Sequence, residues 1–337
     1  MSLLKYAPRL LVEEAELLAS DLYGVNGCAE PLPGERDQNF HLTTESGDEF
    51  VLKISNANED LSFLEAQSQA MAHLKSVVEF CPALIPTKSG KDIVQVSTEI
   101  ASHYVRLVTY IPGEPLAVAK QTTSLLNDFG RRLGIITRHL WPFDHEAFHR
   151  DFHWDLANGM SIIQTYSRHL PDNERQLVER CANSFAESLV PLLPKLPVSV
   201  IHGDANDYNV IVENDRVVGL VDFGDMIHSY TVGELAVGIA YVVLDKSDPL
   251  HWAKAVVSGY ASEWSLDANE LEALWSLVLL RLCMSICLAA QQQEQQPENA
   301  YLGISQVSIR NSLPLLMAIH PGQARNAFRE VIHTQQK

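Results

Sequence analysis

The sequence predicts an α+β protein with two lobes, a small lobe built on an antiparallel sheet with one main helix and a larger, mostly helical lobe. Three observations support this fold class. The length of 337 residues exceeds that of a typical single domain. Short segments rich in Val, Ile, Thr and aromatic residues, separated by turn residues, occupy most of the first third of the chain. Helical patterns dominate from Leu116 onward, so we place the lobes at 1–112 and 113–337, with a hinge near 108–114.

The small lobe begins with leucines at helical spacing from Leu10 to Leu22, and Gly24 ends this predicted helix. A main helix is predicted over 61–74, where helix formers predominate and apolar residues recur at helical intervals. The other segments have the composition of strands and turns. We expect strands around 39–43, 49–54, 93–98 and 104–110.

In the larger lobe, a strand-like insert at 198–223 interrupts the helical patterns. The most apolar segment, 273–290, is long enough for a membrane span. Arg281 lies at its centre, however, together with two serines, and a charge is costly inside a bilayer. We therefore interpret the segment as a buried helix and expect no membrane partner.

Composition and charge exclude several classes of protein. There are 42 acidic against 25 basic residues, a formal charge of −17, which argues against a nucleic-acid partner. The five cysteines form no Cys-x-x-Cys pair, and no uninterrupted apolar stretch resembles an export signal, so a reducing, cytoplasmic location is expected. Cys283 and Cys287 lie one helical turn apart and could form a metal pair, but their apolar neighbours favour a core face.

The densest group of polar side chains among strand residues lies within 200–230. Asp204 is followed by Asn209, and Asp222 emerges from an apolar run thirteen residues later. Two strands flanking a turn would aim Asn209 and Asp222 at a common point. Phosphoryl transfer to an alcohol needs a carboxylate that orients the hydroxyl and accepts its proton, together with oxygen ligands for Mg²⁺. Asp204 suits the catalytic role, and Asn209 and Asp222 suit the binding of the metal. Turn capping would explain each of these residues alone. The ordered set, however, has the spacing of kinase catalytic elements.

These residues carry a resemblance to a known family. His202–Asn209, followed by Asp222–Asp225, resembles the aminoglycoside phosphotransferase and choline kinase superfamily, which has the protein-kinase-like bilobal fold. The similarity is greatest to the hydroxylysine kinases, and it extends to residues 37–41, 50–56 and 106–113 of the small lobe. The match spans most of the chain.

The resemblance implies that the small lobe binds the nucleotide. Lys53 lies in a strand context like that of the ATP-binding lysine, and Glu65 on the following helix would orient it. An isolated strand lysine is otherwise a solvated edge charge. Val108 and Tyr110, in the hinge region, would offer backbone groups to the base.

Residues 34–40 occupy the place of the phosphate-covering loop, although they contain only one glycine. Turn amides and the side chain of Gln38 or Asn39 would contact phosphate, and an ordinary hairpin turn is the alternative.

On the acceptor side, Trp154 and Asp155 resemble a stretch that precedes the catalytic loop in relatives. Asp155, Asp207 and Asp225 are candidates to meet a substrate ammonium, and the sequence does not choose among them. Glu234 is expected to brace the catalytic loop by hydrogen bonds.

His145, His149 and His153 recur every four residues. On a helix they would share a face, which would suit either a zinc site or helix packing.

The resulting prediction is a small-molecule kinase. With Mg²⁺, it would transfer the γ-phosphate of ATP or GTP to the hydroxyl of a cationic amino alcohol or a hydroxy amino acid similar to hydroxylysine. The alternatives are an aminoglycoside, choline or homoserine as acceptor, or a nucleotide-binding scaffold without turnover. A protein substrate is disfavoured because no Ala-Pro-Glu sequence follows Asp222. The sequence indicates no particular oligomeric state.

Overall fold

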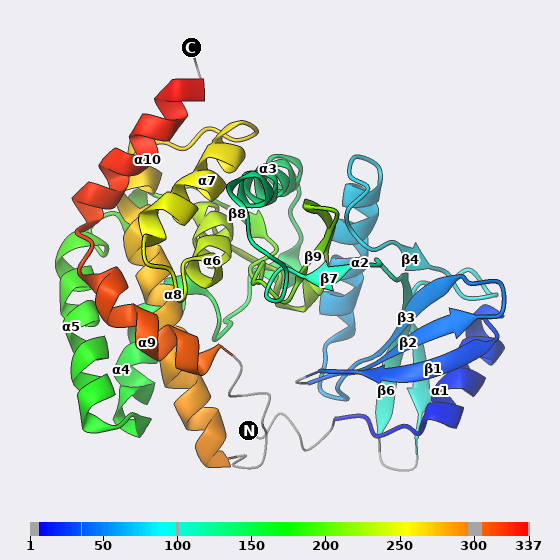
Figure 1. The fold of residues 1–337 in the computed structure, drawn as a ribbon. Coiled ribbons are helices and arrows are strands. Elements are labelled where there is room, and N and C mark those ends of the chain that lie inside the picture. Colours follow the sequence, from blue (N-terminus) through cyan, green and yellow to red (C-terminus); the bar gives the residue numbers. More distant parts are fainter. Residues whose placement is uncertain (1–6, 35, 99–100, 296–304, 336–337) are drawn as a thin grey trace. The chain divides into compact units, whose positions relative to one another are not determined.

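The computed structural model describes residues 7–34, 36–98, 101–295 and 305–335. It consists of two compact units, Met1–Pro112 and Gly113–Lys337 (Figure 1). The first unit contains an antiparallel sheet and the second is mostly helical, so the predicted α+β class is confirmed.

The sheet of the first unit has the strand order β1–β2–β3–β6–β4, and β5 also pairs with β6. Every pairing is antiparallel. The four expected strands correspond to β2, β3, β5 and β6, whereas β1 and the short β4 were not expected. The strands are β1 Gly27–Leu32, β2 Gln38–Thr44, β3 Glu49–Ile54, β4 Leu84–Ile85, β5 Val94–Ser97 and β6 Ser102–Thr109.

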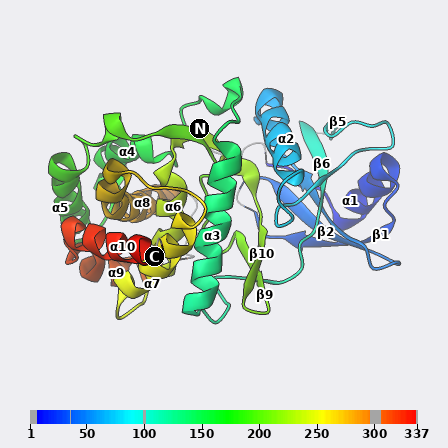
Figure 2. The ribbon, with the colours of Figure 1, turned by 90° about the horizontal axis from the view of Figure 1, so that it is seen from above.

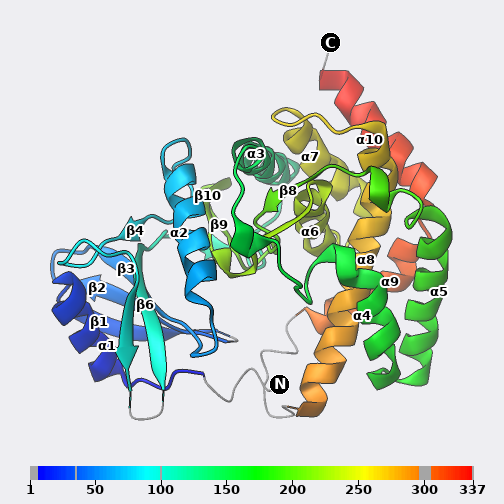
Figure 3. The same cartoon turned by 180° about the vertical axis from the view of Figure 1, so that it is seen from behind.

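The two faces of this sheet have different partners. One face is apolar and packs against α1 (Val12–Leu18), through buried residues that include Phe40, Leu52 and Leu107 (Figures 1 and 3). Alternate positions point to the other face because side chains alternate along a strand. There the buried Arg106 donates from Nη1 to Oε1 of Gln67, on helix α2 (Leu61–Lys75), at 2.9 Å.

The second unit is organised around the long helix α8, which contacts α4, α5, α6, α9 and α10 and lies among them in Figure 2. The helices of this unit are α3 Thr123–Leu140, α4 Gly159–Tyr166, α5 Asp172–Ser188, α6 Val232–Val242, α7 Pro249–Ala261, α8 Ala268–Gln295, α9 Gln306–Met317 and α10 Pro321–Gln335. Short 3₁₀ turns lie at Glu146–Phe148, Leu156–Asn158, Ser167–His169, Leu193–Lys195 and Phe223–Asp225.

Helix α8 contains the segment that is long and apolar enough to cross a membrane by length and composition. Of its most apolar 18-residue stretch, 94% is buried within the protein, as in a core helix. Cys283 and Cys287 lie on this helix with no exposed surface, which agrees with the core-face interpretation.

Helices α3 and α7 cross at unusually close range. A Cβ atom on Gly130 would lie 1.9 Å from the carbonyl oxygen of Val256, and one on Gly259 would lie 1.8 Å from that of Asn127. Each helix therefore places a glycine against the backbone of the other, and no side chain fits between them.

Two small sheets carry the polar segment 200–230. β9 (Val210–Glu213) pairs with β10 (Arg216–Leu220) and with β7 (Glu114–Pro115), while β8 (Val198–Ile201) pairs with β11 (Ile227–Tyr230). The strand-like insert expected at 198–223 thus consists of β8, β9 and β10.

Candidate active site

The segment after β8 is held rigidly by a buried histidine. The backbone N–H of Asp204 donates to Nδ1 of His202 at 3.3 Å, so the proton of the neutral ring lies on Nε2. That Nε2 is 3.1 Å from the carbonyl oxygen of Val221, which follows β10. The His202 ring also meets Phe223 edge to face. One side chain therefore links the segment that contains Asp204 to the segment that contains Asp222.

Glu234 braces the same segment from helix α6, as predicted. Its Oε2 accepts the backbone N–H of His202 at 2.7 Å and that of Gly203 at 3.3 Å. Burial raises the pKa of Glu234 to about 7, and the two backbone hydrogen bonds act against this shift. Gly203 has φ of +79°, and an added Cβ would lie 2.9 Å from the carbonyl oxygen of Asp225, so glycine is required here.

The carboxylate of Asp204 is held by three side chains. Its Oδ2 accepts Nδ2 of Asn206 at 2.9 Å and Nδ2 of Asn209 at 2.8 Å, and its Oδ1 accepts Nη2 of Arg281 at 2.8 Å. Burial raises the pKa of Asp204, while the Arg281 guanidinium favours the ionised form and opposes the shift. Asp204 is therefore a carboxylate of fixed orientation.

Asn209 and Asp222 come together through the β9–β10 hairpin. Val210 pairs with Leu220, and the N–H of Val221 donates to the carbonyl oxygen of Asn209 at 2.9 Å, so Asp222 follows directly. Because Nδ2 of Asn209 is committed to Asp204, its Oδ1 is the atom left to bind a cation. An amide oxygen and a nearby carboxylate are oxygen donors of the type that Mg²⁺ prefers. The donor set therefore fits Mg²⁺.

Arg281 was not predicted as a site residue. It is only 2% exposed, and besides Asp204 it contacts the Tyr241 hydroxyl and the Trp154 carbonyl, each at 3.3 Å. Its guanidinium also lies 4.4 Å from the centre of the Trp154 ring. A lone arginine within an apolar helix requires a buried partner, which is the sequence signal that points to it.

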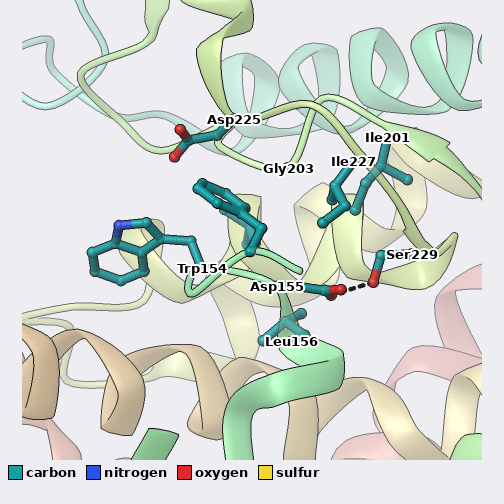
Figure 4. A pocket seen from close by; sticks show the side chains of 10 residues that line it. Trp154, Asp155, Leu156, Ile201, Gly203, Asp225, Ile227 and Ser229 are labelled. Atoms are coloured by element: carbon teal, nitrogen blue, oxygen red, sulfur yellow. Dashed lines mark hydrogen bonds between the residues drawn. The ribbon is translucent and has the colours of Figure 1, made fainter. Parts of the chain in front are cut away.

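Three of the four acceptor-side candidates line one pocket in the second unit. Trp154, Asp155 and Asp225 surround it together with apolar side chains that include Ile201 and Ile227 (Figure 4).

Asp155 already has partners within the protein. Its Oδ1 accepts hydrogen bonds from the Ser229 hydroxyl, drawn in Figure 4, and from the N–H of Ala157 at 2.9 Å. Burial raises its pKa, and these hydrogen bonds act against that shift. Asp155 thus caps the 3₁₀ turn that follows it.

Asp207, the fourth candidate, does not line this pocket. Its Oδ1 is buried and accepts no hydrogen bond from the part of the chain that the structure describes. Burial raises its pKa to about 6. A buried carboxylate oxygen without a donor is unfavourable unless a ligand supplies one.

The three histidines do not share a helix face, so that expectation is wrong. The segment that contains them forms only a short 3₁₀ turn. His149 instead contacts Asp144 and His228: its Nε2 is 2.8 Å from Oδ1 of Asp144, and its ring stacks on that of His228 with 4.1 Å between the ring centres. Candidate ligand atoms of Asp144, His149 and His228 lie within 4.8 Å of one another.

In the first unit, the sheet register places Lys53 opposite Asn39 on β2 and Arg106 on β6. These three side chains share the face that carries α2. On α2, Glu65 is exposed and Gln67 is buried, because the helical spacing turns Gln67 inward and Glu65 outward. The pairing of Glu65 with Lys53 stays a prediction.

The side chains of the expected phosphate loop differ in their contacts; Glu35 lies outside the described residues. Gln38 is engaged at both ends of its amide, accepting the N–H of Leu10 and donating to its carbonyl, each at 2.8 Å. Asn39, by contrast, has a buried Oδ1 without a hydrogen-bond partner in the described chain. Asn39 is thus the better placed of the two to meet a ligand.

The hinge residues lie at and just beyond the end of β6, an internal strand of the same sheet. Val108 pairs with Val51 on one side and Leu84 on the other. The N–H of Tyr110 donates to the carbonyl oxygen of Glu49 at 3.2 Å, and its ring stacks on His41. Contact of Val108 or Tyr110 with a base stays a prediction.

Comparison with known proteins agrees with this geometry. The chain is 33% identical to a hydroxylysine kinase of Xenopus laevis over 322 residues, covering 87% of this chain and 85% of the relative. Its fold resembles that of a microcompartment-associated aminopropanol kinase (TM-score 0.74, 17% identity, covering 94% and 100% of the two chains). It also resembles an amicoumacin kinase in complex with AMP-PNP and Ca²⁺ (TM-score 0.70, 15% identity, 89% and 92%). Residues 29–269 match the phosphotransferase enzyme family known as APH. The chain therefore belongs to this phosphotransferase family and is a small-molecule kinase that acts on a hydroxyl group.

Proposed function

We propose that this kinase transfers the γ-phosphate of ATP or GTP, as the Mg²⁺ complex, to the hydroxyl of hydroxylysine or a similar hydroxy amino acid or amino alcohol. The similarity to a hydroxylysine kinase over most of both chains supports this choice of acceptor. The cysteines are thiols, which suits the cytoplasmic location that we propose for the enzyme.

One observation carries the mechanistic part of the proposal. Asn209 donates from Nδ2 to both the backbone oxygen and Oδ2 of Asp204, at 2.9 and 2.8 Å. The candidate base and a candidate metal ligand are thereby joined in one rigid arrangement. Phosphoryl transfer depends chiefly on such positioning, because the transition state is loose and little covalent chemistry falls to the protein.

In this mechanism, Asp204 accepts a hydrogen bond from the acceptor hydroxyl and so orients the hydroxyl oxygen toward the γ-phosphorus. Asp204 then takes the hydroxyl proton late in the transfer. Asn209 Oδ1 and the Asp222 carboxylate would hold the cation, which would neutralise negative charge on the phosphates. Lys53 and Asn39 supply contacts to the nucleotide phosphates. Gln38 would have to release Leu10 before it could join them.

Glu65, Val108 and Tyr110 remain proposed nucleotide contacts.

We assign the acceptor ammonium to Asp207 in preference to Asp155. The carboxylate of Asp155 is already used by Ser229 and a backbone N–H, whereas Oδ1 of Asp207 has no donor in the described chain. A cationic group beside Asp207 would offset the burial of its charge. Trp154 and Asp225 line a separate pocket of the same unit, and we propose that they contact the rest of the acceptor.

The test is phosphate transfer from ATP and, separately, from GTP to hydroxylysine, homoserine, choline and an aminoglycoside, with Mg²⁺ present and Asp204→Asn as the control. We expect transfer to hydroxylysine and almost none in the variant. Transfer only to another alcohol would replace the proposed acceptor. Tight nucleotide binding without transfer to any acceptor would instead indicate a scaffold.

An additional variant, Asp207→Asn, tests the ammonium assignment. We expect KM for a cationic acceptor to rise about tenfold or more, because a charge-assisted hydrogen bond is lost. KM for the nucleotide should stay unchanged. Asp155→Asn would show the larger rise if the assignment were reversed.

A further inference from the structure

We propose that Arg281 is a positioning residue for the acceptor hydroxyl: its guanidinium holds the Asp204 carboxylate so that Oδ1 alone can receive that hydroxyl. This inference rests on the proposed function, in which Asp204 is the base. Arg281 lies on α8, 77 residues from Asp204 in the sequence, and the two meet only in the folded second unit.

The Asp204 carboxylate has a limited number of hydrogen-bond acceptor positions. An ionised carboxylate offers about four lone-pair positions, two on each oxygen. Asn206 and Asn209 both donate to Oδ2 and fill its two positions. Arg281 donates to Oδ1 at 2.8 Å and fills one of the two positions there. A hydroxyl that donates to Asp204 therefore binds Oδ1, directly beside the guanidinium.

Arg281 is itself held in a fixed orientation by its neighbours. The Tyr241 hydroxyl on α6, the Trp154 carbonyl and the Asp204 carboxylate each engage a different nitrogen of the guanidinium. The face of the guanidinium also lies over the Trp154 ring. A planar cation held at three nitrogens and one face cannot rotate, so the carboxylate that it grips cannot rotate either. The position of Asp204 Oδ1, which receives the acceptor hydroxyl, is thereby fixed by the protein itself.

The Arg281–Asp204 ion pair is not needed for stability alone. A buried ion pair can often be replaced by apolar residues with no loss of stability, so stability alone is a weak reason for it. Arg281 lies among apolar neighbours on α8, and its carboxylate partner is the candidate base. An arginine here keeps Asp204 ionised and oriented, which an apolar residue would not do.

The test compares Arg281→Lys and Arg281→Met with a matched control, Arg310→Met. Arg310 also lies in the second unit and pairs with Glu174 at 2.9 Å, but that pair is partly exposed. We expect Arg281→Met to lower kcat about a hundredfold, as misplacement of a reacting group does. KM for the nucleotide and its dissociation constant should change less than twofold. Arg281→Lys keeps the positive charge but loses the planar set of N–H donors, so its kcat should lie between those of the parent and Arg281→Met. Arg310→Met should retain the parental kcat.

Arg281→Lys and nucleotide hydrolysis provide additional tests of the positioning role. If Arg281→Met does not fold, because Asp204 is left as an unpaired buried charge, then Arg281→Lys decides: parental kcat in that variant overturns the inference. If the folded parent phosphorylates no acceptor of the panel, the proposed function fails separately. The same variants are then compared in nucleotide hydrolysis, in which water replaces the alcohol as acceptor. An unchanged hydrolysis rate in Arg281→Met overturns the positioning role. If Arg281→Met does not fold, an unchanged rate in Arg281→Lys overturns it.

Discussion

The carboxylates of Asp204 and Asp222 differ in their partners, and this difference divides their roles. Asp204 is held by amide and guanidinium donors within the protein. Asp222 is exposed, and its backbone adopts φ of +62°, a left-handed conformation that non-glycine residues rarely adopt. Such strain is typical of residues whose side chain must point at a ligand. Asp204 is therefore suited to the acceptor hydroxyl and Asp222 to a cation.

From this division we expect substitution of Asp204 to affect kcat and substitution of Asp222 to affect metal-dependent nucleotide binding. Asp204→Asn should lower kcat by about 10²- to 10⁴-fold, because the proton acceptor is lost, while the Mg²⁺ nucleotide still binds. Asp222→Ala should weaken nucleotide binding in the presence of Mg²⁺ and leave metal-free binding nearly unchanged. Steady-state kinetics and titration calorimetry with and without Mg²⁺ measure the two effects. Equal loss of metal-dependent binding in both variants would contradict the division.

Among the elements, helix α6 holds the backbone of His202 and Gly203 in place through hydrogen bonds to Glu234. The buried carboxyl has a pKa of about 7 in the folded protein, against about 4.5 in an unfolded chain. As the pH rises from about 4.5 to 7, the unfolded chain loses this proton while the folded protein keeps it. The free energy of unfolding therefore falls over this range, by up to about 3 kcal/mol from this group.

Glu234→Gln should remove that part of the pH dependence. The amide oxygen can still accept the N–H groups of His202 and Gly203, but the side chain no longer titrates. We expect the free energy of unfolding of the variant, measured by urea denaturation, to fall less between pH 5 and pH 7.5 than that of the parent. The exposed Glu187→Gln serves as a control and should follow the parent. A parental slope in Glu234→Gln would show that Glu234 is ionised when buried.

The crossing of α3 and α7 provides a test at the scale of packing. Gly259→Ala would place a methyl group 1.8 Å from a carbonyl oxygen of the other helix, so the helices must separate. We expect a loss of about 1–3 kcal/mol in the free energy of unfolding, or more if the helices cannot adjust. Gly233→Ala is the matched control within a helix, because its methyl group would meet side chains at an ordinary 3.4 Å or more. Similar melting temperatures for the two variants would contradict the close crossing.

For the whole molecule, a nucleotide that binds the folded protein alone must stabilise it. At a hundredfold excess over Kd the gain is about 2.7 kcal/mol, which corresponds to a rise of about 4 °C in Tm for a protein of this size. We expect this rise with ATP or GTP in the presence of Mg²⁺, and its loss when EDTA removes the metal. Differential scanning calorimetry measures both. A rise that survives EDTA would argue against Asn209 and Asp222 as metal ligands.

Features that depend on short stretches of chain could be predicted from the sequence. Asp204, Asn209 and Asp222 lie within nineteen residues of sequence, and one hairpin brings them together, so their spacing already implied their proximity. Glu234 follows closely on the next helix, and its bracing hydrogen bonds were also expected. The family assignment, which rests on these motifs, is confirmed.

Features that depend on which side of an element faces the interior could be predicted less well. Two positions along α2 decide whether Glu65 or Gln67 meets the sheet, and only the packed helix shows that Gln67 does. Gln38 likewise was expected at a phosphate, and the tertiary structure commits it to the chain that precedes α1.

The sequence by itself determined the fold class, the phosphotransferase family and the order of the candidate catalytic and metal-binding residues, because these depend on local spacing and periodicity. Only the tertiary structure decided that Arg281 grips Asp204, and that Asp155 is used within the protein while Oδ1 of Asp207 is not. Such pairings join segments far apart in the chain. They are set by how the helices pack around α8: the apolar residues around Arg281 indicate that it needs a buried partner, but not which carboxylate that partner is.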